Sequence, residues 1–363
     1  MSKLLRLIVV LVAGLTAVSL TAVSAAPAPA KTWKPAIAVY LADGGTPVGA
    51  TQLHPGDTVV VKGTGFDPAA NTTGGLPVPV PPGVPHGTFV TFGAFSPHWK
   101  PSTGAPESAR TTVRAQTKWV LSQDALNRVP DVPFDMRRTV RQQWVELSRS
   151  GAFTARITLA TPKELPANGR WGIYTFGAAN AVNAAQEQMV PLNYSTAPGP
   201  NTPVPASKNL VWAYSPTFAD TVRGTTEGAL SGSGGAAVDD AGAMSFELTA
   251  NTVRNGKGEL RYRGTVVAST RFHLLEIALA DPIITINGTR AVLSMRTSTT
   301  DMNGDDVLRR VALADLTLSS AQIARLERGD DVTGVAASFR SAITPASLAA
   351  LSLGAASPVN IRF

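Results

Sequence analysis

The chain has 363 residues, with 32 Lys and Arg against 25 Asp and Glu, four histidines and no cysteine. Its charges are scattered rather than gathered in runs, which argues against a nucleic-acid groove. Without disulfides the fold depends on core packing, and the chain is long enough for that. The histidines (His54, His86, His98 and His273) have no metal-ligand spacing, so a structural zinc site is excluded.

Residues 1–30 are predicted to be a signal peptide. Lys3 and Arg6 precede an uncharged, mostly apolar stretch at residues 7–20, and residues 23–25 (Val-Ser-Ala) suit cleavage. We expect cleavage near Ala25 and a secreted or cell-surface protein, with an uncleaved N-terminal anchor as the alternative. Removing Lys3 and Arg6 leaves 30 basic against 25 acidic residues, a net charge of about +5. No later stretch approaches the roughly 20 apolar residues of a transmembrane span.

Residues 32–194 are predicted to form an antiparallel β-sandwich, because short β-branched and aromatic runs alternate with turn clusters. The expected strands are residues 58–66, 88–92, 117–121, 143–147, 152–159 and 170–176. Residues 148–151 are expected to form a hairpin corner between two of them. The strand that ends in Gly-Thr-Gly-Phe at residues 63–66 resembles immunoglobulin-like domains of exported bacterial proteins.

Two inserts in this part have alternative interpretations. Residues 76–86 (LPVPVPPGVPH) are expected to form a stiff exposed loop, with a ligand for an aromatic groove as the alternative. Residues 122–142 contain a helix start at Ser122 and the basic stretch of residues 137–141, which favours a solvated face over a phosphate site. Five tryptophans are expected in the core, with sugar stacking as the alternative: Trp33, Trp99, Trp119, Trp144 and Trp171.

A Pro-rich stretch at residues 195–207 is predicted to be an extended linker to a second β-sandwich at residues 208–363. Three Asn-Gly pairs, at Asn255, Asn287 and Asn303, favour tight turns in an antiparallel meander. The expected strands are residues 243–252, 259–270, 272–280 with 283–286, 290–298 and 307–318, with bends at Gly264 and Pro282. The predicted fold class is therefore all-β, with two antiparallel β-sandwich domains in tandem.

Short helices are predicted near the start and the C-terminus of this second domain. Residues 215–216 (Ser-Pro) suit an N-cap and a first helical position, and Gly224 suits a stop. Residues 319–322 form a capping box whose helix ends at Gly329. Residues 344–345 (Thr-Pro) repeat the cap-then-proline start.

Three segments of the second domain resemble the Htaa domain, a module of exported actinobacterial haem-uptake proteins. They are NLVWAYSPTFADTVRGTTEGAL (residues 209–230), LLEIALADPIITINGTRAVLSM (residues 274–295) and TTDMNGDDVLRRVALADLTL (residues 299–318). The likeness extends from Asn209 to about Leu351, and a β-sandwich before such a domain is familiar in that group. The resemblance implies haem binding through a tyrosine phenolate on the first short helix, supported by a histidine on a facing strand.

The residues that the resemblance places at this site differ from that ligand set. Trp212 and Phe218 match the family's tryptophan and phenylalanine, but the tyrosine position falls on Thr221 and the histidine position falls near Arg271. A threonine hydroxyl is too weakly acidic to ligate iron as an alkoxide near neutral pH, whereas a phenol ionises much more readily.

Two nearby residues are candidate replacements for the iron ligand, and one basic residue is a candidate partner for a carboxylate of the bound molecule. Tyr214 precedes the helix, where packing against it as a staple is the alternative. His273 lies two residues beyond the expected place, where a satisfied or solvated histidine is the alternative. Arg271 suits a propionate or another anion.

Motifs of the common catalytic sites are missing: the sequence has no GxSxG, Walker loop, GxGxxG after a strand, or HExxH. Residues 301–306 do not fit a calcium loop, because Asp306 and Ala312 stand where glycine and glutamate are required, so a hairpin turn is expected there. The leading hypothesis is an exported, non-catalytic binding protein whose partners are haem, a haemoprotein or cell-envelope components. The alternative is a structural or adhesion module of the cell envelope that has lost haem binding, and a tryptophan-based carbohydrate-binding protein is a third hypothesis.

Overall fold

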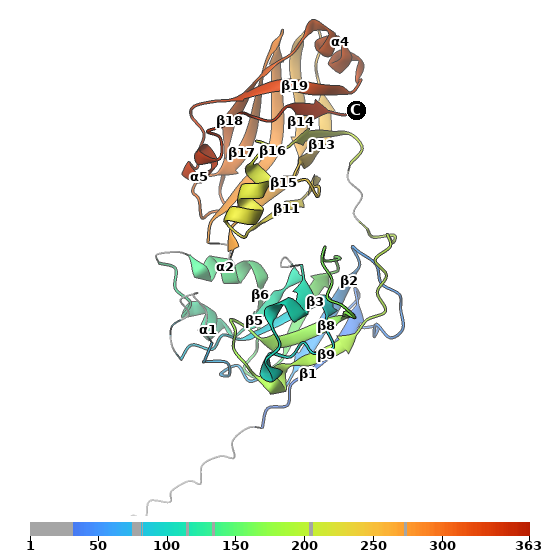
Figure 1. The fold of residues 1–363 in the computed structure, drawn as a ribbon, viewed down its shortest axis with the longest axis vertical. Coiled ribbons are helices and arrows are strands. Elements are labelled where there is room, and N and C mark those ends of the chain that lie inside the picture. The colour runs from blue at the N-terminus through green and yellow to red at the C-terminus, as the bar shows by residue number, and fades with distance from the viewer. Residues whose placement is uncertain are drawn as a thin grey trace, which may run out of the picture. The chain divides into compact units, whose positions relative to one another are not determined.

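The computed structural model in Figure 1 describes residues 32–74, 81, 83–113, 116–132, 135–202, 206–271 and 274–363. Residues Lys34–Phe363 form one compact unit. The fold is mostly β, which confirms the predicted all-β class. The predicted signal peptide, part of the polyproline loop (residues 76–80 and 82) and His273 lie outside the described residues.

In the N-terminal region, residues 32–194, the described residues form two sheets. One has the strand order β1-β2-β7, and the other has the order β6-β5-β3-β8-β9 with β4 paired to β3. All pairs are antiparallel except β5 with β6. The strands are β1 (Ala36–Leu41), β2 (Thr58–Thr64), β3 (Thr88–Phe95), β4 (Arg110–Thr112), β5 (Lys118–Leu121), β6 (Trp144–Glu146), β7 (Phe153–Thr158), β8 (Arg170–Gly177) and β9 (Gln188–Pro191). The helical turns are η1 (Pro101–Thr103), η2 (Glu107–Ala109), α1 (Gln123–Asn127), α2 (Met136–Gln143) and η4 (Ala184–Gln186).

The two sheets share one hydrophobic core. Val59 and Val61 alternate along β2 and are buried with Phe92 and Ile173, which come from the other sheet. Trp171 stacks on Phe92 with ring centroids 5.5 Å apart. Burial of the inward residues of both sheets is the packing of a β-sandwich. The likeness to immunoglobulin domains and the domain bounds stay predictions.

The indole groups in this region have internal contacts. Trp99 is buried, and the Nε1–H groups of Trp119 and Trp144 donate to the backbone oxygens of His86 and Leu121, at 2.7 and 2.8 Å. The core prediction therefore holds for Trp99, whereas four tryptophans are only partly buried: Trp33, Trp119, Trp144 and Trp171.

The prediction of a hairpin at residues 148–151 is wrong. A tight turn is present, since the N–H of Gly151 donates to the oxygen of Ser148 at 2.9 Å. However, β6 before it pairs with β5 and β7 after it pairs with β2, so the turn carries the chain from one sheet to the other. The turn residues Ser150 and Gly151 allow this corner equally well, because turn chemistry does not specify which strands pair.

The helical insert and the first part of the predicted linker are fixed by side-chain hydrogen bonds. Ser122 caps α1 as predicted, accepting from the N–H of Ala125. In the linker, Thr202 donates to the oxygen of Pro55 at 2.7 Å and Asn201 donates to Asp57 at 2.8 Å. The described start of this Pro-rich stretch is therefore attached to the turn before β2.

In the part of the C-terminal region (residues 208–363) that the structure describes, the strands form one sheet. Its strand order is β11-β15-β16-β14-β13-β10-β20-β19-β18-β17, with β12 on β13, and β17 also pairs with β16, so the sheet closes on itself. The strands are β10 (Asn209–Trp212), β11 (Ala229–Ser233), β12 (Ala236–Val238), β13 (Met244–Asn251), β14 (Lys257–Arg263), β15 (Thr265–Ser269), β16 (Glu276–Asn287), β17 (Arg290–Ser298), β18 (Leu308–Thr317), β19 (Val332–Phe339) and β20 (Val359–Ile361). The helices are α3 (Phe218–Asp220), the π-helical turn η5 (Thr221–Thr225), α4 (Ser320–Arg328) and α5 (Ala346–Ala350).

Every named strand pair in this sheet is antiparallel, as predicted. Asn255 and Gly256 both have positive φ, as a type I′ turn requires, whereas at the other two pairs only the glycine does. Gly264 separates β14 from β15, and the register between β16 and β17 shifts between Ala280 and Ile283, so both predicted bends are confirmed.

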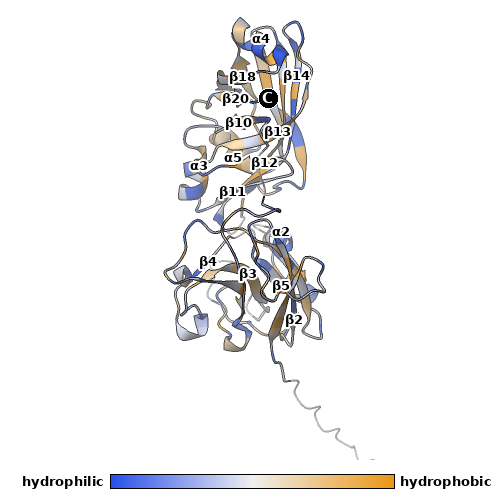
Figure 2. Cartoon of the chain, turned by 90° about the vertical axis from the view of Figure 1, so that its right-hand side faces the viewer, coloured by the Kyte–Doolittle hydropathy of each residue, from blue (hydrophilic) through white to orange (hydrophobic). Residues whose placement is uncertain are grey.

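The C-terminal helices follow their local signals closely. Ser319 and Gln322 form the predicted capping box of α4, and Gly329 ends the helix in the left-handed conformation. Figure 2 shows hydrophilic residues along α4, whose Leu326 is buried. Helix α5 begins one residue later than predicted, with Pro345 at the N-cap, and buries Leu348.

Substitution Gly264→Ala should unfold the C-terminal region at a lower urea concentration. Gly264 has φ +113°, and an added Cβ would lie 2.2 Å from the backbone nitrogen of Ala236. Backbone cannot give way cheaply, so we expect a loss of about 3 kcal/mol or more in the free energy of unfolding. The matched control is Gly288→Ala, with φ +61° and nothing within 4 Å of the new Cβ. Its loss should be about 1 kcal/mol, and equal losses in the two variants would contradict the close approach.

Candidate functional site

The predicted site begins where β10 runs into α3. Leu210 and Trp212 alternate inward along β10 and are fully buried, and Trp212 pairs with Met244 on one side and Val359 on the other. The indole Nε1–H of Trp212 donates to the backbone oxygen of Ser357 at 2.9 Å. Trp212 is therefore held in the core from three sides.

Tyr214 lies at the turn after the strand and is a core residue. Its φ is +61°, which is unusual for a residue with a side chain. Its ring lies 4.8 Å from that of Trp212 and 4.9 Å from that of Phe218, measured between centroids. The phenol donates to Ser352 Oγ at 2.6 Å, because the Ser352 hydroxyl itself donates to the oxygen of Leu348. Burial raises the pKa of Tyr214, so its phenol stays protonated well above neutral pH.

The helix after this turn differs from the prediction at both ends. Ser215 is buried with no bond to its hydroxyl among the described residues, and α3 begins at Phe218 after Thr217, so the N-cap prediction is wrong. The helical segment also extends past Gly224, because η5 is a wider turn in which the N–H of Thr226 donates to the backbone oxygen of Thr221. The aromatic core explains why α3 begins later than predicted. Tyr214 and Ser215 are buried in the core, so they do not form the first turn of the helix.

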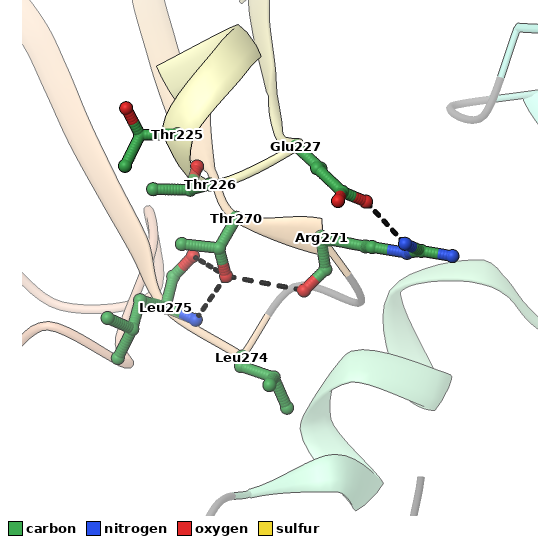
Figure 3. Close-up of a pocket in the computed structure, with 7 residues that line it drawn as sticks. All are labelled: Thr225, Thr226, Glu227, Thr270, Arg271, Leu274 and Leu275. Atoms are coloured by element: carbon green, nitrogen blue, oxygen red, sulfur yellow. Dashed lines mark hydrogen bonds and ion pairs between the residues drawn. The ribbon is translucent and has the colours of Figure 1, made fainter. Parts of the chain in front are cut away.

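A pocket lies beside the end of this helical segment. Its volume is about 420 Å³ and Figure 3 shows its lining residues: Thr225, Thr226, Glu227, Thr270, Arg271, Leu274 and Leu275. One wall follows η5, and the other is the connection between β15 and β16. Threonine methyl groups and leucine side chains make much of the lining apolar, and two opposite charges lie among them.

One backbone hydrogen bond joins the two walls, and a second hydrogen bond orders the β15–β16 connection. The N–H of Arg271 donates to the oxygen of Thr226 at 2.9 Å. The N–H of Leu275 donates to Thr270 Oγ1 at 3.1 Å, which closes the connection on itself. The pocket therefore has a defined shape, set by β-sheet pairing at its base, where Ala229 of β11 pairs with Ser269 of β15.

Arg271 and Glu227 form an ion pair in this pocket, drawn as a dashed line in Figure 3. Their side chains are 41% and 62% exposed. Exposed pairs of this kind contribute between 0 and about 1 kcal/mol. An incoming carboxylate can therefore replace Glu227 at the guanidinium at little cost.

The structure separates the predicted site residues into two groups. Trp212, Tyr214 and Phe218 are buried in the core, and Thr221 is half-buried at the start of η5. Arg271 lines the pocket, and its neighbour His273 lies outside the described residues. The other pocket residues were not singled out from the sequence: Thr225, Thr226, Glu227, Thr270, Leu274 and Leu275. No local pattern marks them, because the pocket forms only when two distant segments meet.

The chemistry of the described pocket residues suits an amphipathic anion better than a metal ion. Hydroxyl, carboxylate and guanidinium groups are present, but none of these residues offers an imidazole, thiolate or phenolate for iron. Across the described part of the chain, no group of three or more His, Cys, Asp or Glu side chains is arranged to hold a metal ion. Nor does any described helix have the length and apolar character to cross a membrane.

The C-terminal region is similar to known proteins. Residues 207–351 match the Htaa family model, which confirms the predicted resemblance. Similar solved structures are the N-terminal domain of HtaA from Corynebacterium glutamicum (17% identity, 44% of this chain, 99% of that chain, TM-score 0.32) and the C-terminal domain of the same protein (15%, 43%, 94%, 0.31). A third is the heme binding protein HtaB from Corynebacterium glutamicum (12%, 42%, 90%, 0.30). None of the curated proteins matches the chain.

Replacing the buried phenol should change stability in alkaline solution. Because the folded pKa of Tyr214 is raised, the unfolded chain loses this proton first, and stability falls as pH rises past about 10 towards the folded pKa. Tyr214→Phe should reduce this alkaline slope, the fall in the free energy of unfolding with pH, by up to about 1.4 kcal/mol per pH unit. At neutral pH it should lower the free energy of unfolding by about 1 kcal/mol, because a hydrogen bond is lost. Urea unfolding at several pH values measures both.

The comparison variant is Tyr262→Phe. Burial also raises the pKa of Tyr262, but its hydroxyl has no hydrogen-bond partner among the described residues. This variant should lower the alkaline slope without the loss at neutral pH. An unchanged slope in both variants would show that these phenols are solvated in the folded protein.

Proposed function

We propose that the protein is an exported, non-catalytic binding protein of the haem-uptake type. It captures haem or a related flat, amphipathic anion at the pocket between η5 and the β15–β16 connection, for hand-over at the cell surface. Export rests on the predicted signal peptide, and the absence of catalysis rests on the missing catalytic motifs.

The observation that carries this proposal is the place of the pocket. All seven lining residues fall inside residues 207–351, the part of the chain that matches the Htaa family. One wall directly follows the first short helical segment, where the resemblance expects the ligand. The family match covers this region as a whole, and the pocket lies within it.

The pocket also has the properties of a small-molecule site. Its volume of about 420 Å³ lies in the usual range for such sites, roughly 300–1,000 Å³. The apolar surface of Leu274 and Leu275 suits a flat hydrophobic ring. Arg271 suits a carboxylate, because a guanidinium donates two parallel hydrogen bonds to it.

Iron ligation in this proposal depends on His273. In sequence it lies between Arg271 and Leu274, and both of these line the pocket. Thr221 supplies no phenolate. Tyr214 would have to leave the core and break its bond to Ser352, so we propose that it supports the pocket from behind, together with Trp212 and Phe218.

The second candidate function is a structural or adhesion module of the cell envelope that has lost haem binding. The observation that favours it is the lack of an iron ligand among the described pocket residues. It predicts binding of the purified protein to isolated cell envelopes with the same affinity in the presence and absence of haemin.

Titration with haemin and with iron-free protoporphyrin tests the proposed site. Both should bind the wild type, and Arg271→Gln should raise the dissociation constant for each about tenfold, as expected for losing one charge-assisted hydrogen bond. The matched control is Arg290→Gln, an exposed arginine of β17, which should bind like the wild type. A porphyrin diester without free carboxylates should not distinguish Arg271→Gln from wild type. No saturable change in absorbance with either porphyrin would refute the proposal.

The iron ligand is tested separately by its spectrum. His273→Ala should shift the Soret band of bound haemin and leave the affinity for iron-free protoporphyrin unchanged. Thr221→Tyr should add a phenolate-to-iron absorption band if this position still faces the ligand. An identical haemin spectrum in wild type and His273→Ala would exclude histidine ligation. Loss of the bound-haemin spectrum in Tyr214→Phe would assign the iron ligand to Tyr214 instead.

A further inference from the structure

Helix α2 of the N-terminal region contacts the C-terminal region through Arg138. The guanidinium donates from Nη1 to Glu276 Oε2 at 2.7 Å and from Nη2 to the backbone oxygen of Asn303 at 2.8 Å, and its Nε–H donates to Asp306. From the same helix, Gln142 Nε2 donates to Glu276 Oε2 at 2.6 Å. Three acceptors of the C-terminal region therefore surround one arginine.

This contact is buried, which distinguishes it from an ordinary surface ion pair. The side chain of Arg138 is 13% exposed and that of Glu276 is 3% exposed. Burial alone would lower the pKa of Arg138, but its hydrogen bonds to Asp306 and Glu276 raise it, so the guanidinium stays charged. A buried carboxylate without its cation is strongly disfavoured. Arg138 therefore helps to hold the buried carboxylate of Glu276 in place.

The turn that supplies two of these acceptors is shaped to admit the arginine. Gly304 has φ +53°, and a Cβ placed on it would lie 2.3 Å from Arg138 Nη2 and 2.7 Å from Glu276 Oε2. The N–H of Gly304 donates to the backbone oxygen of Glu276 at 3.1 Å. A residue with a side chain at this position would push the guanidinium out.

An apolar contact next to the arginine connects it with the pocket. Leu274 packs against a buried cluster of the helical insert, which includes Leu126 of α1 and Met136 and Val140 of α2. Leu274 and Leu275 also line the pocket, and Glu276 follows them directly. Figure 3 shows Leu274 directed away from Thr225 and Thr226, towards a helix.

We propose that Arg138 is a positioning residue for the ligand pocket: by holding Glu276 at the start of β16, it fixes the wall formed by Leu274 and Leu275. The identity of the ligand rests on the proposed function, but the positioning of the wall does not. Ligand binding and the docking of α2 are then coupled, and the coupling is reciprocal, so each strengthens the other. In this way the N-terminal region controls how firmly the pocket holds its ligand.

The test uses two variants that break the contact from opposite sides and one that leaves it intact. Arg138→Ala removes the cation, and Gly304→Ala blocks its place without changing any charge. The control is Arg141→Ala, which removes an exposed arginine from the same helix. All three are made in the full chain. The measurements are amide hydrogen exchange and the rate of haemin dissociation.

Hydrogen exchange reports on the pocket wall without any ligand. In Arg138→Ala and Gly304→Ala, the amides of Arg271, Leu275 and Glu276 should exchange about 5- to 10-fold faster than in Arg141→Ala, because all three belong to the freed wall or its connection to β15. Their N–H groups donate to the backbone oxygen of Thr226, to Thr270 Oγ1 and to the backbone oxygen of Asp301, respectively. Amides of β10 and β13 should be unaffected, which separates this effect from general unfolding. Unchanged exchange at these three amides in both variants would overturn the proposal.

Haemin dissociation then tests the coupling. We expect it to be about 5- to 10-fold faster in both variants than in the control, within the usual range of coupling between sites. Equal rates in all three proteins would overturn the coupling. If the wild type binds no haemin, the proposed function fails, while the exchange measurement still decides whether Arg138 positions the wall.

Discussion

The structure of the C-terminal region depends on the aromatic cluster behind α3. Trp212, Tyr214 and Phe218 are buried together, and Phe339 of β19 lies 4.8 Å from Tyr214 between ring centroids. Full burial of such a side chain contributes about 2–3 kcal/mol. Two further hydrogen bonds, to Ser352 and Ser357, join this cluster to the segment before β20. The first and last strands of the region, β10 and β20, are thus fixed around one set of rings. The same rings restrict the position of α3.

This cluster also limits what the region can do chemically. A phenol in an apolar core stays protonated, since burial disfavours the charged form. Tyr214 therefore serves packing, and the position that the family resemblance assigns to a phenolate holds Thr221. What is left at the surface is a pocket of threonine and leucine side chains with the Arg271–Glu227 pair. Its apolar surface and guanidinium suit a flat ring that bears a carboxylate, and none of its described lining residues carries an imidazole, thiolate or phenolate.

The sequence is most predictive where structure is decided by local chemistry. The capping box at Ser319, the positive φ of Asn255 and the bend at Gly264 follow from residues within a few positions of one another. Ser215 also has a side chain that suits an N-cap, but it does not cap α3. Tertiary packing decides here, because Tyr214 beside it is buried in the core. The corner at residues 148–151 has the composition of a hairpin turn, yet strand pairing is decided by the burial of distant residues.

The least predictable feature is Arg138, because it and its partner are 138 positions apart. In the sequence it belongs to a basic stretch typical of a solvated face, and its neighbour Arg137 indeed pairs with Asp131, at 3.2 Å. Only the fold brings Glu276, Asn303 and Asp306 around its guanidinium. Arginine suits this place better than lysine, since a planar fork with five donors can serve acceptors in several directions at once. An ammonium at position 138 would preserve the charge and lose the geometry, so the start of β16 would be attracted to α2 without being held in one place.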